Sequence, residues 1–209
     1  MTAMREKYKR KGAFRQARDE ILIVCGGQTE RQYFEMFKQV FRPSLGSINV
    51  VTLLKPRSPI QIVEHAINER QKLIDRYNAV WCVFDKDEFK DFDDAISYAK
   101  ANKIGAAYSN QAFEVWFINH FRLFKAPLNR SRYKEELQKF LTFDYDKSEK
   151  VVKKVCDVLL TEGKVQTAIN NSRLGYERHK AENPTSKPSA FESCTTVFKL
   201  AQSLLNWAK

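Results

Sequence analysis

The feature that most constrains this fold is an alternation of short apolar runs with longer helix-patterned segments through residues 20–110. The runs are apolar or β-branched, as strands are, and each of the first three is followed by apolar residues at helical spacing. Strands that are apolar throughout and separated by helices favour a parallel sheet covered on both faces. We therefore expect an α/β fold with a mainly parallel four-stranded sheet. Its strands are EILIVC, SINVVTLLK, AVWCVFD and IGAAYSN.

Local signals predict where the helices begin and where the pattern changes. Thr29 is a candidate N-cap for the first helix, and Pro59 suits the first turn of the second. After Asn110 every periodic segment is helical, including one from Phe191 onward, and AENPTSKPSA is the clearest loop. We expect three parts: a basic flexible arm at 1–19, an α/β core at 20–121, and a helical region packed on the core at 122–209.

Charge points to a polyanionic partner. The chain has a formal net charge of +11, and fifteen Phe, eight Tyr and three Trp supply the apolar surface that a disordered chain lacks. Residues 1–19 and 122–180 are strongly basic, whereas 20–121 is nearly neutral, with its acids concentrated between Asp85 and Asp94. This distribution suits an acidic site with basic approaches, although the Lys and Arg of 122–180 are equally typical of solvated helix faces.

The four cysteines indicate a reducing compartment. They lie far apart with no CxxC pair, so we expect buried thiols rather than disulfides or a zinc cluster. No segment has the apolar length of a signal peptide or a membrane span, so a cytoplasmic protein without membrane contact is expected.

Asp85 and Asp87 are the strongest chemical signal. They follow the third strand, and ligands of open parallel sheets bind outside the carboxyl ends of the strands. Two carboxylates at i and i+2 in an extended segment can turn towards one cation, so they are candidate metal ligands and catalytic residues for Mg²⁺ or Mn²⁺. The alternative is that this acidic run merely favours a helix N-terminus.

Other polar residues after the strands are candidates for substrate contacts. Gly27 and Thr29 could receive a phosphate at a helix N-terminus, although the chain has neither a P-loop nor a dinucleotide fingerprint. Glu30 either reaches the cleft or only complements the first helical turn. The remaining candidates for substrate binding are Lys86, Ser109, Asn110 and Glu114. Glu114 and His120 lie among aromatic residues, so a core helix with a satisfied polar edge is the simpler interpretation of both.

Three motifs together resemble one family. ILIVCGGQTERQYF, VWCVFDKDEF and SNQAFEVWFINHF, in this order, look like the motifs of the RloB-like family of bacterial defence proteins, and TTVFKLAQSLL looks like its C-terminal helix. The resemblance covers residue 20 to the end. It implies a Toprim-like (Rossmann-like) fold, a Mg²⁺ site at Asp85 and Asp87, and action on the phosphodiesters of DNA or RNA in phage defence or abortive infection. It also implies an AAA-type ATPase encoded nearby.

One residue departs from the family pattern. The pattern reads Cys-Glu-Gly after the first strand, whereas this chain reads Cys25-Gly26-Gly27. Three explanations stay open: Glu30 takes over as the acid–base residue, the protein binds metal and nucleic acid without cutting, or the glycine is an inactivating change. Because Glu30 belongs to a helix and not to the loop tip, we expect a weakened or lost site rather than a relocated one. The competing function is a non-catalytic binding module that works with an ATPase.

Overall fold

The protein is described from a computed structural model that covers residues 20–41, 47–52, 58–72, 76–126, 128 and 130–207. The predicted basic arm at 1–19 lies outside these residues. Among the described helices, none combines the length and the apolar character that crossing a membrane requires.

A parallel sheet forms the centre of the fold. Its strands are β1 (Glu20–Cys25), β2 (Ser47–Thr52), β3 (Tyr77–Asp85) and β4 (Gly105–Ser109), in the order β2-β1-β3-β4 with every pair parallel. The α/β class and the parallel sheet flanked by helices are therefore as predicted. Cys25, the last residue of β1, pairs with Val83, so β3 continues for two residues beyond the end of β1, where Asp85 still pairs with Ser109 of β4.

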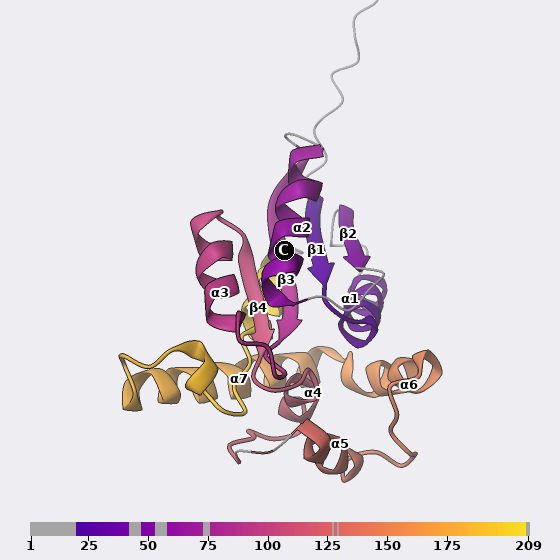
Figure 1. Cartoon of the computed structure of the whole chain (residues 1–209). Coiled ribbons are helices and arrows are strands. Elements are labelled where there is room, and N and C mark those ends of the chain that lie inside the picture. The colour runs from indigo at the N-terminus through magenta and orange to yellow at the C-terminus, as the bar shows by residue number, and fades with distance from the viewer. Residues whose placement is uncertain are drawn as a thin grey trace, which may run out of the picture.

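Helices cover both faces of the sheet and its carboxyl-terminal edge. Helices α2 and α3 pack on one face, while α1 and α8 pack on the other. The strands point towards a separate layer of helices that crosses below the sheet (Figure 1). The helices are α1 (Gln28–Val40), α2 (Pro59–Lys72), α3 (Phe92–Ala101), α4 (Glu114–Asn119), α5 (Arg130–Gln138), α6 (Glu149–Leu159), α7 (Glu162–Glu182) and α8 (Val197–Trp207).

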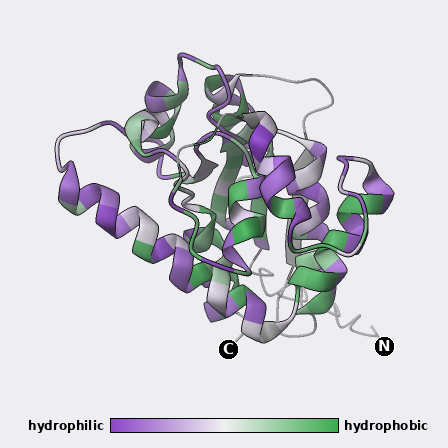
Figure 2. Cartoon of the chain, turned by 90° about the horizontal axis from the view of Figure 1, so that it is seen from below, coloured by the Kyte–Doolittle hydropathy of each residue, from purple (hydrophilic) through white to green (hydrophobic). Residues whose placement is uncertain are grey.

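Alternation along β1 divides the core in two. Leu22 and Val24 pack with α2 and α3, whereas Ile21, Ile23 and Cys25 pack with α1, α4, α6 and α8. Residues from both the predicted α/β core and the predicted helical region therefore share one apolar cluster. All four cysteines are buried free thiols, as expected. Seen from below, the long helix α7 carries many hydrophilic residues along its visible length (Figure 2), and it buries only a narrow stripe that includes Val165 and Ile169.

Two local predictions were wrong. Thr29 is not an N-cap: α1 begins at Gln28 with Gly27 in the cap position, so Thr29 is inside the first turn and buried. The segment after Phe191 is not helical until Val197. Residues 194–196 run extended along the outer edge of β4, where the Thr196 N–H donates to Tyr108 O (2.8 Å) and the Asn110 N–H donates to Cys194 O (2.8 Å). Pairing with an open strand edge outweighs local helix propensity here.

Candidate functional site

A pocket of about 340 Å³ opens at the carboxyl-terminal edge of the sheet. The β1–α1 turn, the start of α2 and the end of β3 with its following loop form its walls. Lys147, from the loop before α6, reaches it from the helical layer. It is lined by Gly26, Gly27, Gln28, Thr29, Glu30, Pro59, Ile62, Phe84, Asp85, Asp87, Phe89, Phe113 and Lys147. Five of these, Gly27, Thr29, Glu30, Asp85 and Asp87, are residues predicted from the sequence.

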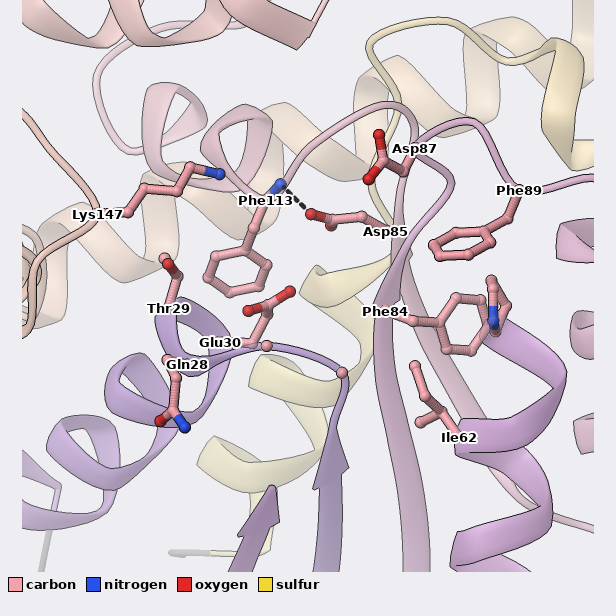
Figure 3. Close-up of a pocket in the computed structure, with 13 residues that line it drawn as sticks. Gln28, Thr29, Glu30, Ile62, Phe84, Asp85, Asp87, Phe89, Phe113 and Lys147 are labelled. Carbon is pink, nitrogen blue, oxygen red and sulfur yellow. Dashed lines mark hydrogen bonds between the residues drawn. The ribbon is translucent and has the colours of Figure 1, made fainter. Parts of the chain in front are cut away.

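The carboxylate of Asp85 is strongly perturbed. Asp85 Oδ2 accepts a hydrogen bond from the Phe113 backbone N–H at 3.0 Å (Figure 3). Asp85 Oδ1 is buried and finds no hydrogen-bond partner within the described part of the chain. Burial raises the pKa of the Asp85 carboxyl well above its ordinary value, and the charges of Glu30 and Glu114 raise it further, while Lys147 and the Phe113 N–H act in the opposite direction. A further positive charge would stabilise this group in its ionised form.

Glu30 reaches the pocket in spite of its place on a helix. Its side chain is buried and folds back over the turn, so that a β-carbon added at Gly27 would lie 2.5 Å from Glu30 Oε2. Glycine at position 27 therefore leaves the room that the Glu30 carboxylate occupies. The argument that its place on a helix disfavours Glu30 left out this backward direction, which side chains in the first turn of a helix commonly take.

Glu114 does not line the pocket, but its charge acts on Asp85, and it binds two residues that sequence reasoning missed. Glu114 Oε1 accepts hydrogen bonds from Tyr145 Oη (3.0 Å) and Lys147 Nζ (2.8 Å). Glu114 Oε2 is buried and has no partner among the residues that the structure describes. Burial raises the pKa of the Tyr145 hydroxyl, and the Glu114 charge adds to the shift. No local motif marks Tyr145 or Lys147, because both come from an irregular loop far along the chain.

Asp87 lies in the turn after β3. Its φ of 44° is in the left-handed region, which Asp tolerates better than most residues, and its N–H donates to Gln111 O at 3.2 Å. The Asp85 side chain points towards Phe113, and the Asp87 carboxylate lies above the Asp85 side chain in the view of Figure 3. Within the described ranges, no three His, Cys, Asp or Glu side chains are arranged as a ready-made metal site.

The wall opposite the carboxylates is apolar. A β-carbon added at Gly26 would lie 2.7 Å from Ile62 Cδ1, so Ile62 fills the space into which a side chain at position 26 would project. Ile62, Phe84 and Phe89 lie on the side of the pocket away from Phe113 (Figure 3). Where the resemblance led us to expect an acid, this chain therefore has an apolar contact. Ile62 was not singled out from the sequence, because an apolar residue at helical spacing predicts only a buried helix face.

Three predicted residues take other positions. Ser109 Oγ bonds Thr195 Oγ1 (3.1 Å), and Asn110 Nδ2 donates to Ser189 O (2.9 Å), so both attach the segment before α8 to β4. Lys86 does not line the pocket, and its N–H donates to Ser109 O. His120 is also buried elsewhere.

The environment of His120 is that of a core residue. Its Nδ1 lies 2.9 Å from Trp116 O, which can only accept, so Nε2 is left to accept from Tyr33 Oη at 3.2 Å. Burial lowers the pKa of His120 to about 3. The neutral imidazole completes a buried polar network, as the simpler interpretation of the sequence predicted.

A second pocket adjoins the first. It has a volume of about 360 Å³ and shares Gln28 and Lys147 with the first pocket. Its other lining residues are Arg31, Gln32, Glu35 and Glu149. Lys147 thus lies where the two pockets meet.

Comparison with known proteins supports the resemblance seen in the motifs. The model of the RloB-like protein family matches residues 21–204. The chain belongs to the RloB-like family. No curated protein matches, and no solved structure matches. The match begins within β1 and ends within α8, so every residue that lines the pocket belongs to the matched region.

Proposed function

We propose that this RloB-like chain is a Toprim-like, Mg²⁺- or Mn²⁺-dependent nuclease-type protein of bacterial phage defence, acting on nucleic-acid phosphodiesters. The observation that carries the proposal is the buried Asp85 Oδ1, which has no hydrogen-bond partner among the described residues and lies beside the charges of Glu30 and Glu114. A carboxylate in this situation is costly unless a cation compensates it.

The chemistry of the pocket fits a hard divalent cation. Asp85 Oδ1 is a buried oxygen that lacks a partner in the described structure, and Asp87 lines the same pocket. Glu114 Oε2 is likewise buried without a partner among the described residues, close enough for its charge to act on Asp85 but outside the pocket lining. Oxygen ligands of this type suit Mg²⁺ and Mn²⁺, so Asp85 and Asp87 would hold the ion. When bound, the ion would supply Lewis-acid polarisation of the phosphodiester.

The chain's own residues provide the remaining functions. Glu30 would hold or move a proton at the phosphodiester, a contribution that is typically worth about 10²–10⁴-fold in rate. Lys147 is half-exposed at the junction of the two pockets, so its ammonium group can reach a phosphate oxygen. Thr29 and the Gly26–Gly27 turn form the pocket wall next to Glu30.

The surroundings of Gly26 favour a second candidate function, a binding module without catalytic activity. Ile62 occupies the space of a side chain at position 26, so the wall opposite Asp85 offers no acid. A non-catalytic nucleic-acid or nucleotide binding module that works with an AAA-type ATPase would need no acid there. If the protein is such a module, its binding of nucleic acid should weaken steeply with salt, and no cleavage product should form.

The test measures Mn²⁺ binding by titration calorimetry and cleavage of labelled DNA and RNA. We expect the wild type to bind Mn²⁺ and Asp85→Asn/Asp87→Asn to lose this binding. Asp157→Asn, at an exposed acid of α6, is the matched control and should behave as wild type. Unchanged Mn²⁺ binding in the double variant would refute the metal site. Metal binding without cleavage at any metal concentration would favour the binding module.

A further inference from the structure

The main pocket has two chemically different halves. The carboxylates of Glu30, Asp85 and Asp87 lie on one side. The other side is built from Pro59, Ile62, Phe84 and Phe89 and carries no charged side chain among the pocket's lining residues (Figure 3). A phosphate is not expected to bind in this apolar half, because no side chain that lines it carries a positive charge.

Phe89 is exposed at the rim of this apolar half. It is 39% exposed, whereas most large aromatic side chains of the described chain are buried. Phe89 follows Asp85 and Asp87 in the same loop, and its N–H donates to Lys86 O at 3.1 Å, which holds the loop turned. An aromatic ring is therefore presented to solvent next to the acidic half. An exposed apolar ring at the edge of a polar pocket is typical of a binding surface.

We infer that the apolar half is a subsite for an unpaired nucleobase, with Phe89 as the ring on which the base stacks. This inference rests on the proposed function, because a phosphodiester held on the acidic side places its own nucleoside beside Phe89. A base is flat, uncharged and apolar on its faces, which matches a wall that contains aromatic and aliphatic side chains. Aromatic side chains next to a phosphate-binding region are the usual way in which single strands are held.

The size of the pocket restricts the substrate to single strands or displaced bases. A volume of about 340 Å³ is near the lower end for small-molecule sites and has no room for a double helix. A base within a duplex hides its faces in the stack and must leave it to reach such a pocket. The substrate class is therefore a single-stranded or unpaired segment of nucleic acid.

The experiment compares binding of a fluorescein-labelled oligothymidylate, an oligouridylate and a duplex by anisotropy, using the full chain with Ca²⁺. We expect both single strands to bind more tightly than the duplex. Phe89→Ala should weaken single-strand binding roughly 5- to 150-fold, the usual range of base stacking, and Phe89→Trp should retain it. Tyr98→Ala is the matched control: Tyr98 is also 39% exposed, but it lies on α3 outside the pocket, so its loss should change nothing.

The readouts separate this inference from the proposed function. Phe89→Ala should leave Mn²⁺ binding unchanged, because the Phe89 side chain has no atom that binds a metal ion. Equal single-strand binding by wild type and Phe89→Ala, or a preference of wild type for duplex, would overturn the base subsite while leaving the metal site intact. A change of molecular mass in Phe89→Ala, measured by light scattering, would instead assign the ring to a protein contact. Phe89-dependent strand binding by a chain that binds no Mn²⁺ would support the subsite and refute the metal site.

Discussion

The contact between Gly26 and Ile62 gives a quantitative prediction for Gly26→Ala. The added β-carbon would lie 2.7 Å from Ile62 Cδ1, whereas ordinary contacts begin at 3.4 Å, so Ile62 has to retreat. Ile62 lies on α2, is 2% exposed and belongs to the core cluster on that face of the sheet, so its movement disturbs packed neighbours. Overpacking of this kind costs about 1–3 kcal/mol, and the lower chain entropy of alanine returns about 0.4–1 kcal/mol. We expect Gly26→Ala to lower the free energy of unfolding by up to about 2.6 kcal/mol.

The Ile62→Val background removes the atom that the added β-carbon at position 26 would contact. Valine lacks the Cδ1 atom, and the next neighbour of the added β-carbon, Val83 O, is 3.4 Å away. Gly26→Ala should therefore be neutral or slightly stabilising in this background, although Ile62→Val itself costs about 0.5–1.5 kcal/mol. Urea denaturation followed by tryptophan fluorescence measures all four proteins of the cycle.

A control variant separates packing from backbone effects. A β-carbon added at Gly163, in the first turn of α7, meets nothing within 4 Å. Gly163→Ala should therefore stabilise the protein by up to about 1 kcal/mol in both backgrounds. Equal losses from Gly26→Ala in the wild-type and Ile62→Val backgrounds would refute the packing argument. Any attempt to restore an acid by Gly26→Glu faces the same contact, so that activity test belongs in the Ile62→Val background.

Two further predictions concern buried polar groups. Lys147→Met should lower the free energy of unfolding by roughly 1.5–3 kcal/mol, because it leaves the buried Glu114 carboxylate without its cation. Lys139→Met, at an exposed ion pair, should lower it by less than about 1 kcal/mol. Equal losses for the two variants in urea denaturation would contradict this prediction. Because burial lowers the pKa of His120 to about 3, its unfolded form takes up a proton below pH 6.5 that the folded form refuses. Stability should thus fall from pH 6.5 towards pH 3 by at most about 1.4 kcal/mol per pH unit, and His120→Phe should flatten this slope in denaturation curves; an unchanged slope would contradict it.

The sheet and the acidic end of β3 follow from local sequence. Continuous apolar runs such as EILIVC can only be buried on both faces, and parallel strands place their carboxyl ends together, so the neighbourhood of Asp85 was predictable. The extended segment at Thr195 and Thr196 carried only the weak signal of two β-branched residues. It was predicted as helix because nothing local reveals that the edge of β4 is open.

The details of the pocket depend on tertiary contacts that no local pattern encodes. Lys147 meets Glu114 across more than thirty residues of chain, and Glu30 enters the pocket because its side chain turns back over Gly27. Ile62 becomes important only because it packs where a residue at position 26 would extend. The spacing of residues along a sequence predicts which helices and strands pack together. Which atoms come into contact depends on the direction of each side chain, which that spacing does not reveal.

The extended segment at residues 194–196 affects the order in which parts of the fold can form during synthesis. Thr196 Oγ1 accepts a bond from the Tyr108 N–H across 88 positions of chain, so the outer edge of β4 is closed by residues that the ribosome adds much later. Until then the nascent chain exposes an unpaired strand edge, which is a template for association with other chains. Asn110, which follows β4, also lacks the Ser189 carbonyl to which its side chain donates until that later segment has been made. The contacts that close the edge of β4 are therefore among the last of the fold that the growing chain can form.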